Sequence, residues 1–159
     1  MIRKAFEADL EEISSLAKIV RENMLESGLN QWLGDYPAYS DFYRDFKNDA
    51  LYIKVIEDKI IGSISILPEN DPAYLEVSWQ SDKALVVHRV LVEPSLQGKG
   101  IGKELINHSF SLAKEKGYEA VKIDTHPDNL KMQKMLKSLN FVYRGYLSSI
   151  NRLAYELVI

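Results

Sequence analysis

The chain has 159 residues, 46% of them hydrophobic, so it is long and apolar enough to bury the core of one domain without metals or disulfides. Its net charge of −3 argues against a general nucleic-acid or anionic-membrane binder, and the absence of cysteine excludes disulfides, thiolate nucleophiles and cysteine metal ligands. The three histidines have no metal-type spacing, so no metal site is predicted. With no signal-like N-terminus and no stretch near the roughly 20 apolar residues of a membrane span, the sequence predicts a cytoplasmic protein.

The first half of the chain predicts a strand, two helices and a strand hairpin. Asp9 with Glu12 fits a capping box at the start of the first helix, and Ser40 fits the N-cap of the second. Residues 74–77 predict a short edge strand. The other predicted elements are a strand over 2–6, a helix from 9 to 28, a loop over 29–39, a short helix from 40, and hairpin strands over 51–56 and 60–67.

The second half predicts strands and helices in alternation, followed by two strands. Asp128 fits the N-cap of the last helix, and Asn140 fits a left-handed residue that closes it. The predicted elements are a strand over 84–92, a helix over 103–116, a strand over 119–125, a helix from 128, and strands over 141–146 and 152–158. Together these predict one α/β domain over residues 1–159, with a mixed, largely antiparallel sheet of six to seven strands and four helices.

A glycine-rich turn over residues 97–102, Gln-Gly-Lys-Gly-Ile-Gly, joins the predicted strand 84–92 to the following helix. Strand, glycine turn and helix together form a cradle in which backbone N–H groups and the helix dipole attract a phosphate. The turn is not a P-loop, because Gly100 follows Lys99 and no hydroxyl is available for magnesium, which disfavours an ATP-using enzyme. It is not a dinucleotide fingerprint, because Lys103 stands where the third glycine belongs.

The turn resembles the pyrophosphate loop of the GNAT N-acetyltransferase superfamily. The family pattern Gln/Arg-x-x-Gly-x-Gly/Ala is met by Gln97, Gly100 and Gly102, behind the Val-x-Pro step that begins at Val92. A second motif agrees. Asn129 stands where the family has an asparagine opening the helix after the fifth strand, and the family's Gly-Phe step about a dozen residues later is matched by Asn140-Phe141. The predicted order of elements is similar to the GNAT fold over the whole chain, in which two central strands splay apart.

The resemblance implies acetyl-CoA as cosubstrate and identifies the residues that would bind it. Val90, Leu91 and Val92 would offer backbone groups to the pantetheine arm, and Asn129 would face the same arm. The pyrophosphate would be wrapped by Gln97, Gly98, Lys99, Gly100, Ile101, Gly102 and Lys103. The family often places a proton-donating tyrosine seven residues after the asparagine, but that position here is Leu136, so no general acid is predicted there.

Several side chains are candidates for catalysis or acceptor binding. His88 lies in the strand before the cradle and has a suitable pKa for a general base, although a histidine packed on a strand is the alternative. Glu76, Glu93 and His126 are weaker candidates. Tyr143 or Tyr146 is the candidate proton donor to the leaving thiolate. In the superfamily the segment with Gln31, Trp32, Asp35, Tyr36 and Tyr39 borders the acceptor, where aromatic and acidic side chains could hold a cationic amine; packing onto the core is the alternative.

The predicted function is an acetyl-CoA-dependent N-acetyltransferase that transfers acetyl directly to a primary amine. The absence of cysteine agrees with transfer without a covalent enzyme intermediate. A non-catalytic acyl-CoA-binding or regulatory module is the alternative, because Leu136 replaces the family tyrosine. No nucleic-acid or membrane partner is predicted, and homodimers are frequent in the superfamily.

Overall fold

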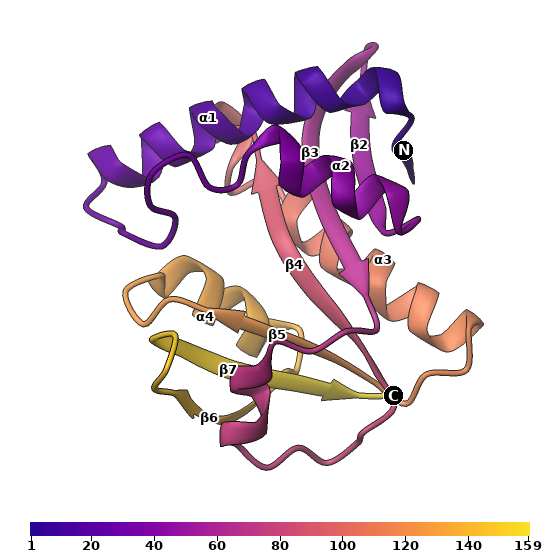
Figure 1. Ribbon diagram of the computed structural model, residues 1–159, viewed down its shortest axis with the longest axis vertical. Coiled ribbons are helices and arrows are strands. Elements are labelled where there is room, and N and C mark those ends of the chain that lie inside the picture. Colours follow the sequence, from indigo (N-terminus) through magenta and orange to yellow (C-terminus); the bar gives the residue numbers. More distant parts are fainter. The chain divides into compact units, whose positions relative to one another are not determined.

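The computed structural model describes residues 1–159 as an open seven-stranded sheet, with strand order β1-β2-β3-β4-β5-β7-β6, and four α-helices (Figure 1). The pairing of β4 with β5 is parallel, whereas β1–β2, β2–β3, β5–β7 and β6–β7 are antiparallel. This confirms the predicted fold class. The strands are β1 Ile2–Lys4, β2 Leu51–Ile56, β3 Lys59–Leu67, β4 Ala84–Val92, β5 Ala120–Thr125, β6 Val142–Leu147 and β7 Arg152–Val158. The helices are α1 Leu10–Glu26, α2 Tyr39–Lys47, α3 Ile101–Glu115 and α4 Leu130–Ser138, with 3₁₀ turns η1 Glu7–Asp9, η2 Pro72–Glu76 and η3 Pro94–Leu96.

The chain forms two compact units. Unit 1 consists of residues 1–66 and 89–106, and unit 2 of residues 67–88 and 107–159. Strand β4 and helix α3 each contribute residues to both units. The second half of β4 and the start of α3 therefore belong to unit 1, together with the glycine turn.

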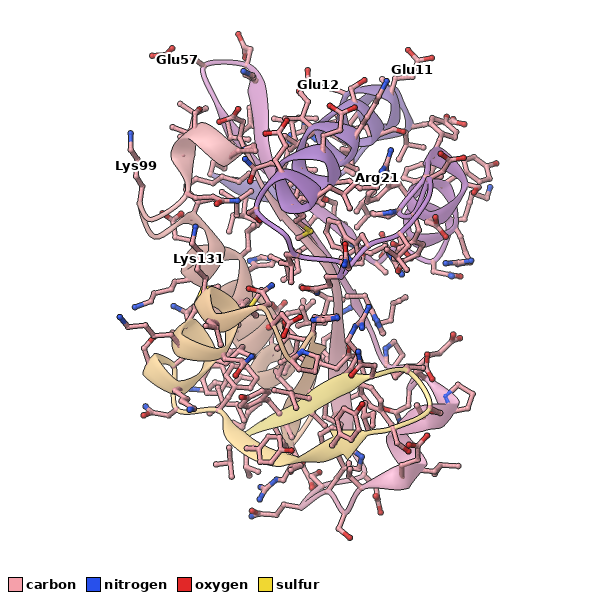
Figure 2. All side chains as sticks on the ribbon, turned by 90° about the vertical axis from the view of Figure 1, so that its left-hand side faces the viewer. Glu11, Glu12, Arg21, Glu57, Lys99 and Lys131 are labelled. Carbon is pink, nitrogen blue, oxygen red and sulfur yellow. The ribbon has the colours of Figure 1, made fainter.

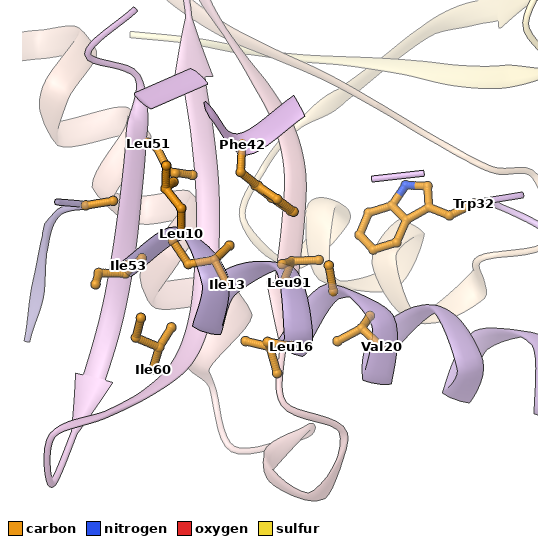
Figure 3. Packing of buried hydrophobic residues seen from close by; sticks show 12 residues of the cluster. Leu10, Ile13, Leu16, Val20, Trp32, Phe42, Leu51, Ile53, Ile60 and Leu91 are labelled. Atoms are coloured by element: carbon orange, nitrogen blue, oxygen red, sulfur yellow. The ribbon is translucent and has the colours of Figure 1, made fainter. Parts of the chain in front are cut away.

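The core of unit 1 forms where α1 and α2 bury their apolar faces on β2, β3 and β4 (Figure 3). Residues at helical spacing on α1 point into it, and Trp32 from the following loop joins them. Burying one such aliphatic side chain contributes about 1.5–3 kcal/mol. The labelled members are Leu10, Ile13, Leu16, Val20, Trp32, Phe42, Leu51, Ile53, Ile60 and Leu91.

The β2–β3 hairpin brings the start of α3 close to the sheet. Its turn is made by Glu57 and Asp58, with φ angles of 51° and 62°, and β3 begins at Lys59, one residue earlier than predicted. A side chain at Gly62 of β3 would place its Cβ 3.1 Å from Leu105 Cδ1 and 3.4 Å from Ile101 Cγ2. Any side chain at Gly62 would force these neighbours to shift by a few tenths of an ångström, because the first turn of α3 packs directly on the strand.

One apolar cluster of unit 2 lies where the segment containing η2 packs on strands β4, β6 and β7. Its apolar members are Ala73, Tyr74, Val86, Leu147 and Ala154. The predicted edge strand over residues 74–77 is wrong, because Pro72 begins a 3₁₀ turn there and the Asp71 side chain accepts a hydrogen bond from the Ala73 N–H at 2.8 Å.

Two predicted caps in unit 1 are wrong, because the acidic side chains at α1 bind other donors and Ser40 lies inside α2. The Asp9 carboxylate accepts from the Phe6 N–H at 2.7 Å and pairs with Arg3 at 2.8 Å, so it does not cap α1. Glu12 accepts from the Ile60 N–H at 2.7 Å instead of closing a capping box. Helix α2 begins at Tyr39, before Ser40 could cap it.

The third predicted cap is wrong by one residue. Asn129, not Asp128, caps α4, and its side-chain oxygen accepts from the Met132 N–H at 3.1 Å. Asn140 has a φ of 68° and closes the helix as predicted.

Candidate functional site

The glycine turn is held at both ends by unit 1. At its start, the Glu93 N–H donates to the Ile61 carbonyl of β3 at 2.8 Å. The Glu93 carboxylate accepts from the Ser95 N–H at 2.8 Å and from the Ser95 hydroxyl, which stabilises η3. At its end, Ile101 is buried. Glu93, a minor candidate for the general base, thus serves to cap the loop.

The turn itself is exposed and depends on left-handed glycines. Gly98 and Gly100 have φ angles of 80° and 84°, which residues with a Cβ rarely adopt. The Gly100 carbonyl then accepts from the Glu104 N–H at 3.0 Å as the first bond of α3. The glycines therefore let the chain change direction abruptly between β4 and the helix.

Six consecutive backbone N–H groups, those of residues 98–103, donate no hydrogen bond within the protein. They stand at and before the N-terminus of α3, where the helix dipole adds positive potential. Lys99 and Lys103 are both exposed, and Figure 2 shows Lys99 extending away from the chain. Exposed donors, glycines and two cations together form a surface suited to a phosphate or pyrophosphate.

Strand β4 leads into this turn through a distorted backbone. Its parallel ladder with β5 covers Ala84–Val87 only. Arg89 follows with a φ of 50°, and then Val90, Leu91 and Val92 run to the loop. Leu91 is fully buried in the unit 1 core, whereas Val90 and Val92 are partly exposed.

The sequence of residues 13–141 matches the Acetyltransferase (GNAT) family. The chain belongs to the GNAT family. The human protein N-acetyltransferase 8B is 30% identical over 109 residues, which are 67% of this chain and 45% of that protein. An uncharacterised N-acetyltransferase of Methanocaldococcus jannaschii is 31% identical over 113 residues, covering 66% of this chain and 46% of the relative. The chain thus spans under half the length of these relatives.

Solved structures of GNAT acetyltransferases share the fold over nearly the full length of both chains. A protein of Streptococcus agalactiae superposes with a TM-score of 0.89 at 23% identity, covering 100% of this chain and 95% of its own. One of Listeria monocytogenes gives a TM-score of 0.83 at 18% identity, covering 100% and 94%. No helix of the protein is both long and apolar enough to span a membrane.

Unit 1 brings together most of the residues that the GNAT resemblance assigns to acetyl-CoA. Residues 90–92 and 97–103 form one continuous run from β4 into α3. Asn129 belongs to unit 2, where it caps α4. His88 also belongs to unit 2 and is half-buried in β4.

The candidates for a proton donor lie on β6, at the edge of the sheet. Tyr143 is 50% exposed, and its ring meets that of Tyr155 edge-on at 5.6 Å between centroids. The Tyr146 hydroxyl donates to Asn151 at 2.7 Å. Leu136, at the family tyrosine position, is fully buried and contributes only to packing.

The segment expected at the acceptor has mixed roles. Trp32 is buried in the unit 1 core, which agrees with the packing alternative. Tyr36 remains 41% exposed, and its hydroxyl accepts from Arg89 Nη1 at 3.0 Å. Tyr39 opens α2 and stacks on Tyr43.

A polar cluster at the carboxyl end of β5 escaped the sequence analysis. The Tyr74 hydroxyl donates to Asp124 at 2.7 Å, and Arg152 lies 4.0 Å from the same carboxylate. Burial raises the pKa of Asp124, and the Tyr74 hydrogen bond and Arg152 oppose that rise only in part. Burial lowers the pKa of His126, whose Nδ1 accepts from the Asp128 N–H at 3.0 Å. The signal in the sequence was the charge at alternate positions of an otherwise apolar strand.

The last minor candidate, Glu76, is engaged in unit 2. Its carboxylate accepts from the Ser148 hydroxyl and from the Ser149 N–H and hydroxyl, and these bonds hold its pKa below the usual value. It fastens η2 to the β6–β7 turn.

Proposed function

We propose that the protein is an acetyl-CoA-dependent N-acetyltransferase that transfers the acetyl group directly to a primary amine. The observation that carries the proposal is the run of six unbonded N–H groups over residues 98–103, in a loop with the GNAT pyrophosphate pattern. Such donors suit the pyrophosphate of coenzyme A, and residues 90–92 would offer backbone groups to its pantetheine arm. Family membership supports acyl transfer, and the similarity to relatives named N-acetyltransferase supports an amine acceptor.

In the proposed reaction the neutral amine nitrogen attacks the thioester carbonyl carbon. The tetrahedral intermediate then collapses, the carbon–sulfur bond breaks, and coenzyme A leaves as the thiolate. The amine must lose a proton, which His88 would accept directly or through water, and the thiolate gains one, which Tyr143 would donate. Positioning of the two reactants supplies most of the acceleration. The leaving group needs little assistance, because a thiolate can depart without full protonation.

Ligand-induced stabilisation tests the cosubstrate. Coenzyme A at about 100 times its Kd should stabilise the native state by about 2.7 kcal/mol and raise Tm by several degrees, while ATP and NAD should have far less effect. Equal stabilisation by all three ligands, or none by coenzyme A, would contradict the proposal. Release of free thiol from acetyl-CoA should then be measured with a panel of primary amines. Binding of coenzyme A without acetylation of any amine would favour the non-catalytic alternative.

The proposed roles of His88 and Tyr143 have separate tests. His88→Gln should lower kcat/KM and remove the acidic limb of its pH profile, because only the neutral imidazole can accept the proton of the amine. Tyr143→Phe should lower kcat about 10²-fold at saturating acetyl-CoA, and Tyr146→Phe tests the alternative phenol on the same strand. If both phenylalanine variants keep full kcat across the pH range, the thiolate leaves without protonation by a phenol.

A cytoplasmic location and a homodimer stay predictions of the sequence and the family resemblance.

A further inference from the structure

Arg89 is the one residue other than glycine that has a left-handed backbone inside a strand. Its φ is 50°, a conformation that costs a residue with a side chain about 1–2 kcal/mol. Such a conformation persists only where the surrounding structure holds it. The other non-glycine residues with positive φ all lie in turns, and they are Asp49, Glu57, Asp58, Asn140 and Asn151.

A buried ion pair holds the Arg89 side chain. Its Nε and Nη2 donate to the two carboxylate oxygens of Asp45 on α2, at 2.7 and 2.6 Å. The side chains are only 8% and 1% exposed. Burial disfavours the charged guanidinium, but the Asp45 carboxylate outweighs it and raises the pKa of Arg89. A bidentate pair of this kind fixes the orientation of the guanidinium as well as its position.

Two further bonds make the pair a junction of unit 1. The Ser65 hydroxyl of β3 donates to Asp45 at 2.6 Å, and Arg89 Nη1 donates to the Tyr36 hydroxyl in the loop before α2 at 3.0 Å. Strand β4, strand β3, helix α2 and the preceding loop are thereby tied to one another at the residue where the backbone of β4 is left-handed. Asp45 accepts three hydrogen bonds in all, and these offset the cost of burying its charge.

The junction lies directly before the segment that the proposed function uses. Arg89 is followed by residues 90–92, which would offer backbone groups to the pantetheine arm, and by Glu93, which is bonded to Ile61 of β3. This segment is therefore anchored at both ends, by the ion pair on one side and by a backbone bond on the other. A displacement of about 1 Å at a reacting centre can cost a factor of about 10² in rate.

We propose that Arg89 and Asp45 are positioning residues for acyl transfer: their ion pair holds the left-handed backbone of β4 and so sets the alignment of residues 90–92 for the thioester-bearing arm. The proposal rests on the proposed function. In this proposal the ion pair affects binding of the pantetheine arm, whereas the glycine turn binds the pyrophosphate. Removal of the pair should therefore weaken binding of the arm and leave binding of the pyrophosphate unchanged.

The test replaces the pair without leaving a buried charge. The triple variant Asp45→Leu/Ser65→Ala/Arg89→Met exchanges the ion pair and its hydroxyl partner for apolar groups, a change that is often neutral for stability. Calorimetry then measures the affinity of two ligands. One is coenzyme A, and the other is 3′-phospho-ADP, which keeps the pyrophosphate and lacks the pantetheine arm. Arg144→Met, which removes an arginine from the buried Glu156 of unit 2, is the matched control.

We expect coenzyme A to bind the triple variant at least tenfold more weakly, while 3′-phospho-ADP binds within threefold of the wild type. The kcat at saturating acetyl-CoA should fall at least tenfold, and the control should change none of these values. An unchanged ratio of the two affinities, with unchanged kcat, would overturn the proposal. If the triple variant does not fold, Arg89→Lys decides by the same ratio, since lysine keeps the charge and loses the two-bond fork. Failure of the wild type to bind either ligand would instead refute the proposed function.

Discussion

Each unit of the protein contains one buried carboxylate paired with an arginine, but the two pairs have different surroundings. In unit 1, Asp45 is held by Arg89 and the Ser65 hydroxyl. In unit 2, Glu156 accepts from Arg144 at 2.7 Å and from the N–H groups of Gln80 and Ser81 at 2.8 and 3.0 Å. Both carboxylates are at most 1% exposed, so neither can do without donors.

The difference lies in what each pair fixes. Glu156 fastens a connecting segment to the face of the sheet through backbone donors, and Arg144 is 20% exposed at its edge. Asp45 has no backbone donor to its carboxylate, so Arg89 is its principal partner, and that residue carries the left-handed backbone beside the proposed cosubstrate segment. The same chemistry thus supports packing in unit 2 and local geometry at the candidate site in unit 1.

Removal of each arginine gives the largest expected effect. Arg89→Met should cost about 3–5 kcal/mol of unfolding free energy, because Asp45 would keep only a hydroxyl donor in a buried place. Arg144→Met should cost about 1–2 kcal/mol, because Glu156 keeps two backbone donors and the nearby charge of Lys122. Urea denaturation of both variants measures the difference. Equal losses would show that the remaining donors do not compensate for the arginine.

An effect of intermediate size is expected when alanine replaces one of two glycines with similar φ angles, one in each unit. Gly100 and Gly117 have φ angles of 84° and 76°, and a Cβ at either would meet no atom within 4 Å. Alanine at either position should therefore cost a similar amount, about 1–2 kcal/mol, from backbone strain alone. Only Gly100→Ala should also weaken coenzyme A binding, by at least tenfold, because the turn presents the N–H groups. Loss of binding in Gly117→Ala would mean that strain, not position, is responsible.

Two aspartates should give smaller effects of opposite sign in a pH titration of stability. Burial alone would raise the pKa of Asp9, but Arg3 and the Phe6 N–H outweigh it and the pKa is lowered. Its contribution is present above the unfolded pKa, about 3.9, and is lost as pH falls through the folded value. Asp9→Asn should therefore lower Tm at pH 7, and the difference from the wild type should vanish in acid.

The pKa of Asp124 in unit 2 is raised by burial, so its ionised form costs stability at neutral pH. Asp124→Asn keeps an acceptor for Tyr74 and should raise Tm at pH 7. The advantage should shrink as pH falls through the folded pKa toward about 3.9, below which both states of the wild type are protonated. Thermal melts between pH 3 and 7 measure both aspartate variants. A lower Tm for Asp124→Asn at neutral pH would show that its charge is stabilised by the cluster.

The sequence by itself determined the elements whose signal is local. Strands β4 and β7 were predicted with their observed bounds, since mainly apolar runs ended by turns need no distant partner to be recognised. The left-handed residue that closes α4, Asn140, and the glycine turn over 97–102 could likewise be predicted, because few residue types tolerate those conformations. The resemblance to the GNAT family that this turn carries was confirmed by the family match over residues 13–141.

Only the tertiary structure decided which polar groups meet. Asp9 and Glu12 look like a capping box in the sequence, yet Arg3 and the Ile60 N–H take them, because a cap is worth only about 1 kcal/mol and a nearby donor competes with it. Arg89 and Asp45 lie 44 residues apart, and the residues next to them in the sequence do not predict that they pair. An ion pair forms between whichever charges the packing of helices on strands brings together. The left-handed backbone of β4 depends on that packing and could not be read from the chain alone.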